Sequence, residues 1–230
     1  MIDRTINSFH PSRSTIPNHV GIIPDGSRRW ARQAGVSLYE SYVHAMRLLT
    51  EIIAFLYEAG VRIVSVYFSS SQNFERPEQE VDSFCRAETF FCKEFFPAVA
   101  NRYRVRVKFC GDQSLVPQFL VDALKNLVEG TRKFSGNELN ICVAYNPIDE
   151  LWDSMNRSST PAEFINNLRI TTPVDLIIRT GKANLISNFL PLQSGFARLY
   201  FPDKLFNELK LDDIAEIIDT FKEIERRYGE

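Results

Sequence analysis

The stretch HVGIIPDGSRRW, residues 19–30, joins a strand pattern directly to a helix pattern. Its first five residues form a short apolar run that is typical of a buried strand. A proline, an acid and a glycine follow, and the hydroxyl and arginines after them open a helical segment. A strand that passes through a tight turn into a helix is the repeating unit of α/β proteins with parallel sheets.

The same alternation continues along the chain and predicts further strands and helices. Helical patterns are expected over residues 38–60, 78–102, 117–134 and 212–227, and strands over 61–67, 104–109, 139–144, 174–178 and 198–201. Six short apolar strands separated by helices predict one α/β domain, with about six mostly parallel strands covered by helices on both faces. We expect a flexible leader over residues 1–17 and the folded domain over 18–230.

Composition excludes several protein classes. The 230 residues are 44% hydrophobic and 24% charged, which is typical of a globular core and not of a disordered chain. No apolar run approaches the ~20 residues of a membrane span, and no signal peptide is apparent, so we expect a cytoplasmic protein. The net charge of −2 argues against nucleic acid as a partner. Four cysteines without a CxxC pair are interpreted as inert core thiols.

Polar residues gather where the first predicted strand ends. Asp25 and Gly26 follow the strand, and the next helix opens with Ser27, Arg28 and Arg29. Backbone N–H groups at a helix N-terminus and adjacent guanidinium groups together form a site for a phosphate. The alternative is that Asp25 or Ser27 only caps the helix, with the arginines in solvent.

Two more clusters follow later strands. Residues 68–77 combine hydroxyls, two amides and an arginine, and are either a ligand-binding segment or a capped loop. Residues 179–188 place a guanidinium, a glycine, a lysine and a hydroxyl where another strand ends. Ligands of open α/β sheets bind beyond the carboxyl ends of the strands, so we expect two phosphate groups to be held at one edge. The motifs GxxxxGK, GxGxxG, HExxH and DDxxD are absent from the sequence.

The three clusters, in this order, resemble the cis-prenyltransferase family, typified by undecaprenyl diphosphate synthase, over about residues 18–229. The resemblance implies a catalytic domain over 18–230, prenyl diphosphate substrates and a homodimer, for which the apolar region 196–201 is the candidate interface. It gives Asp25 the roles of assisting diphosphate departure and holding Mg²⁺, and it places Asn73 and Ser70 beside the reacting carbons. The substrate-binding residues it implies are Gly26, Ser27, Arg28, Arg29, Trp30, Ser71, Phe74, Arg76, Arg179, Ser187 and Arg198.

The sequence departs from the family pattern at several positions. An arginine and a histidine that flank the allylic diphosphate in the family are Leu38 and Tyr42 here, and the glutamate expected to bind magnesium is Arg198. Further departures are Gln72, Phe74 and Leu185. Either Arg198 binds phosphate in place of the metal, or Asp25 and phosphate oxygens hold magnesium alone.

These departures favour one branch of the family. The Asp-Gly-x-Arg-Arg-Trp start resembles enzymes that join two allylic diphosphates head to middle into lavandulyl-type products. Dimethylallyl diphosphate would be coupled to dimethylallyl or geranyl diphosphate, with release of diphosphate. The alternatives are a diphosphate lyase similar to tuberculosinol synthase, ordinary chain elongation with isopentenyl diphosphate, and a non-catalytic subunit of a prenyltransferase complex.

Overall fold

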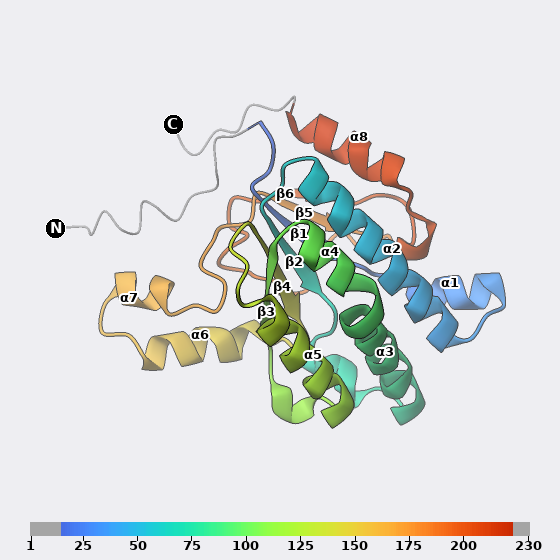
Figure 1. The fold of residues 1–230 in the computed structure, drawn as a ribbon, viewed down its shortest axis with the longest axis horizontal. Helices are drawn as coiled ribbons and strands as arrows, with labels where there is room; N and C mark the ends of the chain where they lie inside the picture. Colours follow the sequence, from blue (N-terminus) through green and yellow to red (C-terminus); the bar gives the residue numbers. More distant parts are fainter. Residues whose placement is uncertain (1–14, 223–230) are drawn as a thin grey trace.

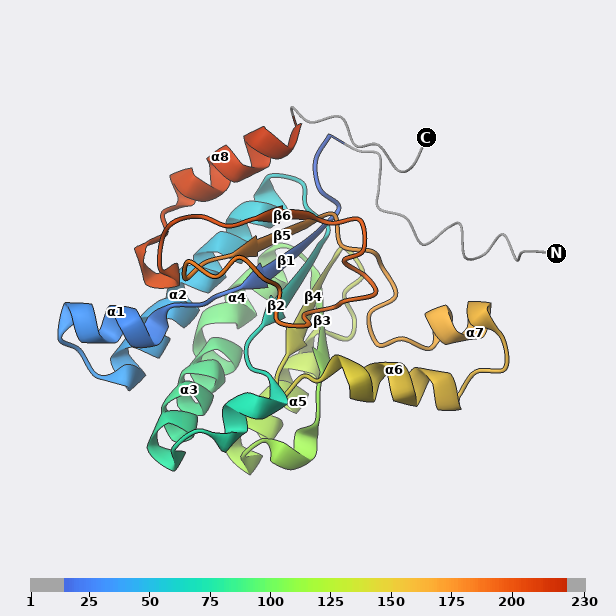
Figure 2. The same ribbon diagram turned by 180° about the vertical axis from the view of Figure 1, so that it is seen from behind.

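The computed structural model describes residues 15–222 and has a single six-stranded sheet (Figures 1 and 2). The strands are β1 (His19–Ile23), β2 (Ile63–Tyr67), β3 (Val105–Cys110), β4 (Asn137–Cys142), β5 (Leu176–Arg179) and β6 (Arg198–Tyr200). Their order is β3-β4-β2-β1-β5-β6, and every neighbouring pair is parallel. The predicted α/β class and six parallel strands are therefore confirmed.

The helices follow the predicted alternation, with differences of a few residues at their ends. They are α1 (Ser27–Ala34), α2 (Leu38–Glu58), α3 (Glu78–Phe90), α4 (Phe96–Arg102), α5 (Gln118–Thr131), α6 (Pro147–Asn156), α7 (Pro161–Asn166) and α8 (Leu211–Lys222). The single helix predicted over 78–102 is wrong in one respect, because a π-helical turn, Phe91–Phe95, separates α3 from α4. The end of the last predicted helix and residues 1–14 of the predicted leader lie outside the described residues.

The two faces of the sheet are covered differently. Helices α2, α3, α4, α5 and α8 contribute to the larger core cluster on one face (Figure 1). On the other face, the apolar cover comes from residues 170–197 outside β5, which contain no helix, and α6 and α7 lie to one side (Figure 2). Helices were predicted on both faces, and this segment differs because its prolines, glycines and serines interrupt any helical pattern.

A buried polar network secures the start of β1. The His19 Nε2 atom lies 2.7 Å from the Ser65 hydroxyl, which also accepts a hydrogen bond from the Asn140 amide at 3.0 Å. The Nδ1 atom of His19 faces the carbonyl oxygens of Thr172 and Pro173 at 3.1 and 3.2 Å. Burial lowers the pKa of His19 to about 4, so the imidazole is neutral at neutral pH.

This network predicts acid sensitivity of the fold. A histidine with a folded pKa below its usual 6.5 contributes stability above pH 6.5 and loses it as the pH falls toward 4. We expect the free energy of unfolding to fall by about 2 kcal/mol between pH 7 and pH 5 from this group. Urea titrations at both pH values should show this loss in the wild type and in His44→Gln, and a much smaller loss in His19→Gln. An equal loss in all three proteins would contradict the prediction.

Candidate active site

A polar cleft of about 530 Å³ lies at the carboxyl ends of β1, β2 and β5. It is lined by Ile23, Pro24, Asp25, Gly26, Ser27, Arg28, Arg29, Arg32, Tyr42, Tyr67, Phe68, Ser69, Ser70, Gln72, Asn73, Arg76, Arg179 and Ser187. All three clusters expected from the sequence contribute to this list. The parallel sheet brings them together because its strands end at one edge, as expected for a ligand crevice of an open α/β sheet.

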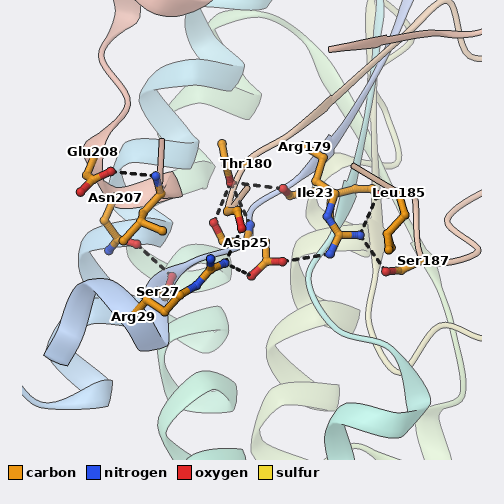
Figure 3. Close-up of polar contacts among 12 residues, drawn as sticks. Ile23, Asp25, Ser27, Arg29, Arg179, Thr180, Leu185, Ser187, Asn207 and Glu208 are labelled. Carbon is orange, nitrogen blue, oxygen red and sulfur yellow. Dashed lines mark hydrogen bonds and ion pairs between the residues drawn. The ribbon is translucent and has the colours of Figure 1, made fainter. Parts of the chain in front are cut away.

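The N-terminus of α1 opens into the cleft, and no side chain within residues 15–222 caps it. Gly26 occupies the N-cap position, and no acidic residue lies in the first turn. The Ser27 hydroxyl donates to Asn207 Oδ1 at 3.0 Å and so points away from the helix end (Figure 3). The capping alternative is therefore wrong for both Asp25 and Ser27. Free N–H groups and the helix dipole make this end suitable for a phosphate.

Asp25 lies between two arginines (Figure 3). Its Oδ2 atom accepts from Arg179 Nη2 at 2.9 Å, and its Oδ1 atom is 3.5 Å from Arg29 Nη2. Thr180 holds the Asp25 backbone, because its hydroxyl accepts from the Asp25 N–H at 3.0 Å and donates to the Asp25 carbonyl at 2.8 Å. The carboxylate is thus fixed in position while its side chain stays 38% exposed.

Arg179 connects the end of β5 to the loop that follows it. The guanidinium is 9% exposed and donates through Nη1 to the Ser187 hydroxyl at 2.7 Å and to the Leu185 carbonyl at 2.9 Å. Its Nε atom is buried and has no hydrogen-bond partner within residues 15–222. Arg179 therefore orients both Asp25 and Ser187 on one side of the cleft.

Glu80 organises a second pair of arginines. This buried carboxylate lies 3.0 Å from Arg76 Nη1 and 3.3 Å from Arg28 Nε. The Tyr42 hydroxyl donates to Glu80 Oε1 at 3.5 Å. Burial and the nearby charge of Glu80 raise the pKa of Tyr42 to about 12. Sequence analysis missed Glu80, although its position four residues after Arg76 indicates an ion pair on one helical turn. The cleft thus has arginines at both sides.

Ser70 and Asn73 are also at the cleft. The Ser70 N–H donates to Asn73 Oδ1 at 3.0 Å, where Ser70 is the N-cap of the 3₁₀ helix η2 (Ser71–Glu75). Phe68, the first residue of the cluster 68–77, also lines the cleft, whereas Tyr67 at the end of β2 and Arg32 line it and were missed. Arg32 follows Arg28 by one helical turn, which is the signal that points to it.

Four residues predicted to bind substrate do not line the cleft. Trp30 stacks on His44 with ring centroids 4.9 Å apart, and Phe74 packs edge-on against Phe84 at 5.4 Å. Ser71 begins η2 and is also absent from the cleft lining. Arg198 pairs with Leu176, the first residue of β5, so it lies at the opposite edge of the sheet from the cleft. Substrate contacts of these residues stay predictions.

Magnesium fits this site only together with a substrate. Among residues 15–222 there is no group of three or more His, Cys, Asp or Glu side chains that could hold a metal ion. Asp25 is the single carboxylate in the cleft lining. Mg²⁺ is commonly bound by one or two carboxylates and by substrate phosphates, which is the arrangement Asp25 allows.

Gly181 is required for the geometry of Asp25. It has a φ of +82°, and a Cβ atom added there would lie 2.7 Å from Arg29 Nη2 and 2.8 Å from Asp25 Cγ. We expect Gly181→Ala to displace this pair and to lower kcat/KM about a hundredfold. Gly35→Ala is the control, because Gly35 has a φ of +68° and open space around it. Equal loss of activity in steady-state assays of both variants would contradict this role.

Comparison with known proteins identifies the family. The family model described as "Putative undecaprenyl diphosphate synthase" matches residues 23–229. The chain belongs to this family, the cis-prenyltransferases. This cis-prenyltransferase is 33% identical over 233 residues to the tritrans,polycis-undecaprenyl-diphosphate synthase (geranylgeranyl-diphosphate specific) of Pyrococcus horikoshii, covering 93% of this chain and 87% of the relative. It is 31% identical to the enzyme of the same name from Thermoplasma acidophilum, covering 93% of this chain and 89% of that protein.

Solved structures agree with this assignment. The crystal structure of lavandulyl diphosphate synthase from Lavandula x intermedia in complex with dimethylallyl diphosphate superposes with a TM-score of 0.88 at 26% identity, covering 94% of this chain and 99% of the other. A probable undecaprenyl diphosphate synthase from Campylobacter jejuni shares the fold, with a TM-score of 0.73 at 24% identity over 93% and 98% of the two chains. This cis-prenyltransferase is therefore an enzyme that transfers prenyl groups. None of its helices within residues 15–222 has the length and apolar character needed to cross a membrane.

Proposed function

We propose that this cis-prenyltransferase couples two short allylic diphosphates head to middle. The observation that carries the proposal is the unequal size of the two spaces at the site. The cleft of about 530 Å³ has arginines on both sides, whereas the partly apolar cavity that continues from it holds only about 50 Å³. Two diphosphates with short tails suit these spaces better than a long polyprenyl chain. Similarity to lavandulyl diphosphate synthase supports the same reaction.

Binding of the donor uses the start of α1. The N–H groups after Gly26, together with Arg28 and Arg29, hold the diphosphate of dimethylallyl or geranyl diphosphate as it leaves. Donors aimed at developing charge contribute ~3 to 4 kcal/mol each when preorganised. Arg179 and Ser187 hold the diphosphate of the acceptor, dimethylallyl diphosphate. Since the donor-binding and the acceptor-binding residues line one cleft, the two substrates are brought into contact.

The coupling reaction needs no oxidant or reductant. The donor C1–O bond breaks, and its electron pair leaves with diphosphate. The C2=C3 electron pair of the acceptor forms the new bond to donor C1, which leaves a tertiary cation at C3. Loss of a proton from an adjacent methyl group restores a double bond and gives the branched product. A diphosphate oxygen takes the proton, and Asn73 and Ser70 position it, because neither side chain is basic.

Magnesium would be held by Asp25 and diphosphate oxygens. A bound Mg²⁺ neutralises the charge that develops on the leaving group. Placement of Arg198 at the other edge of the sheet favours this alternative over direct replacement of the metal by Arg198. We expect EDTA to abolish turnover and added MgCl₂ to restore it. Full activity in EDTA would contradict magnesium binding at Asp25.

Chain elongation with isopentenyl diphosphate is the second candidate. Its support is the name shared by the Pyrococcus and Thermoplasma relatives, which are 31–33% identical to this chain. The two reactions differ in their substrates. Head-to-middle coupling needs only allylic diphosphates, whereas elongation needs isopentenyl diphosphate as the acceptor.

Product analysis separates the candidates. The purified protein is incubated with dimethylallyl diphosphate alone, with dimethylallyl and geranyl diphosphates, and with geranylgeranyl and isopentenyl diphosphates. After phosphatase treatment, mass spectrometry should find branched C10 or C15 alcohols in the first two mixtures. Linear products from the third mixture only would overturn the proposal in favour of elongation. An unphosphorylated terpene formed from one substrate without coupling would indicate a diphosphate lyase.

A homodimer is part of the proposal. β6 is the last strand of the sheet formed by residues 15–222, and its neighbourhood exposes Phe196, Leu199 and Leu192 at 50%, 47% and 37%. A strand at the end of a sheet, with large exposed apolar side chains beside it, is a common site of association. Light scattering of the purified protein should give about twice 26.5 kDa, and a monomer would contradict this interface.

A further inference from the structure

Asn207 is a buried amide beside the start of α1. It lies in the 3₁₀ helix η5 (Phe206–Glu208) and is only 6% exposed. Its Oδ1 atom accepts from the Ser27 hydroxyl at 3.0 Å (Figure 3). Its Nδ2 atom donates to the Ser41 carbonyl at 2.8 Å. One side chain thus joins the first residue of α1 to the first turn of α2.

Further contacts complete a buried network around this amide. The Ser41 hydroxyl donates to the Ser27 carbonyl at 2.8 Å, and both serines are buried. The Asn207 Nδ2 atom also lies 3.3 Å from Nδ1 of His44, whose ring stacks on Trp30 of α1. Buried polar networks whose members are paired fix the relative position of the elements that they join. Asn207 therefore fixes α1 against α2.

The segment around Asn207 also holds the turn before α1. The Phe206 N–H donates to the Asp25 carbonyl at 3.1 Å. Leu205 packs so closely on Gly26 that a Cβ atom added to the glycine would lie 2.9 Å from the leucine Cβ. None of the three residues of this segment is part of the cleft lining. The segment therefore acts on the cleft through the turn and the helix start that it holds.

The orientation of Ser27 decides what the helix end offers to a ligand. A hydroxyl at the start of a helix can accept from nearby backbone N–H groups and so compete with a bound anion. Because the Ser27 hydroxyl donates to Asn207 instead, the N–H groups and the positive end of the helix dipole stay available for a phosphate. An amide suits this position, since its oxygen accepts from one serine while its nitrogen donates to the other.

We propose that Asn207 is a positioning residue for the diphosphate bound at the start of α1. It acts through Ser27 and Ser41, by fixing the first turn of α1 and by keeping the Ser27 hydroxyl away from the N–H groups. This inference rests on the proposed function, because it requires the donor diphosphate at this end of the cleft.

Binding of geranyl thiolodiphosphate tests the proposal without turnover. Its dissociation constant is measured by calorimetry, and urea unfolding gives the stability of each protein. We expect Asn207→Leu to raise the dissociation constant about tenfold, because the first turn of α1 is no longer fixed. Asn140→Leu is the matched control. Asn140 is also a buried amide, donates to the Ser65 hydroxyl at 3.0 Å and is not part of the cleft lining. Its loss should lower stability and leave the dissociation constant unchanged.

A double-mutant cycle shows whether Asn207 acts through Ser27. Ser27→Ala alone should raise the dissociation constant about threefold, because it removes one buried hydrogen bond of the network. Added to Asn207→Leu, it should cause no further rise, because the hydroxyl has already lost its partner.

The inference is overturned by any of three results. The first is an unchanged dissociation constant in Asn207→Leu. The second is an equal rise in Asn140→Leu, since that result assigns the effect to a general loss of stability. The third is a double variant in which the losses from Ser27→Ala and Asn207→Leu multiply. Asn207→Ala and Asn140→Ala replace the leucine variants if either does not fold. Because the readout is binding, failure of this inference is distinct from failure of the proposed coupling, which product analysis detects separately.

Discussion

An Asp25→Asn variant is expected to lose about a thousandfold in kcat, while its KM for the allylic diphosphates stays the same or falls. The carboxylate lies between Arg29 and Arg179 and compensates part of their charge. The amide removes the negative charge that fixes both guanidinium groups and that would hold magnesium. Arg29 and Arg179, with less of their charge compensated, still attract diphosphate, so substrate binding survives. The groups around the reacting atoms are no longer held in place, so kcat falls. Steady-state kinetics with both allylic substrates give the two constants.

Asp203→Asn is the control for this result. Asp203 is an exposed acid near the site that pairs with Lys182 at 3.1 Å, and its side chain is 85% exposed. Exposed pairs of this kind contribute little to stability, so the variant should behave as the wild type. Full activity of Asp25→Asn, or of Asp25→Ala in a reconstituted complex, would instead support the alternative of a non-catalytic subunit.

An Arg179→Met variant is expected to lose at least a hundredfold in kcat/KM and about 2 kcal/mol in the free energy of unfolding. The guanidinium is buried, and it bonds to Asp25, to Ser187 and to the Leu185 carbonyl. Methionine fills a similar volume without any of these donors. Arg179→Lys should be intermediate in activity, because a single ammonium group cannot match a planar guanidinium at several acceptors. Kinetics and urea unfolding measure the two effects.

Arg169→Met separates stability from catalysis. Arg169 is partly buried, donates to the Gly111 carbonyl at 2.9 Å and pairs with Asp153 at 2.8 Å, and it is not part of the cleft lining. Its loss should lower stability and leave kcat/KM nearly unchanged. If Arg169→Met lowers activity as strongly as Arg179→Met, the effect at Arg179 is a general loss of folding and not a loss of the site.

Much of the sheet and half of the site follow from local patterns. β1 is short, apolar and ended by Asp25 and Gly26, so the sequence places both the strand and the cluster after it. The same reasoning locates Arg179, because it ends another apolar run. The rule that strand ends meet at one edge then predicts that the clusters containing Asp25 and Arg179 share this edge, and the structure brings the two side chains into contact at 2.9 Å.

The remaining features depend on contacts that no local pattern records. Thr180 holds the Asp25 backbone through two hydrogen bonds. These form only after β5 pairs with β1. The position of Arg198 in the family pattern led to the prediction that it lies at the cleft. The parallel pairing of β6 with β5 places it instead at the opposite edge of the sheet from the cleft. Glu88, a buried acid on α3, is one turn after Phe84 and three residues before Phe91, a spacing that indicates a buried position; that its Oε2 atom has no hydrogen bond within residues 15–222 needs the structure.

The central position of β1 has a consequence for how this chain folds. Asp25 and Arg179 are 154 residues apart in sequence and meet because β5 pairs with β1. Contacts of such long separation slow folding, and no fragment that lacks either strand contains a complete site. A ligand that bridges the two sides therefore binds only the complete domain, and at a hundred times its Kd it adds about 2.7 kcal/mol to the global stability. Inorganic diphosphate should accordingly raise the temperature of a single cooperative melting transition.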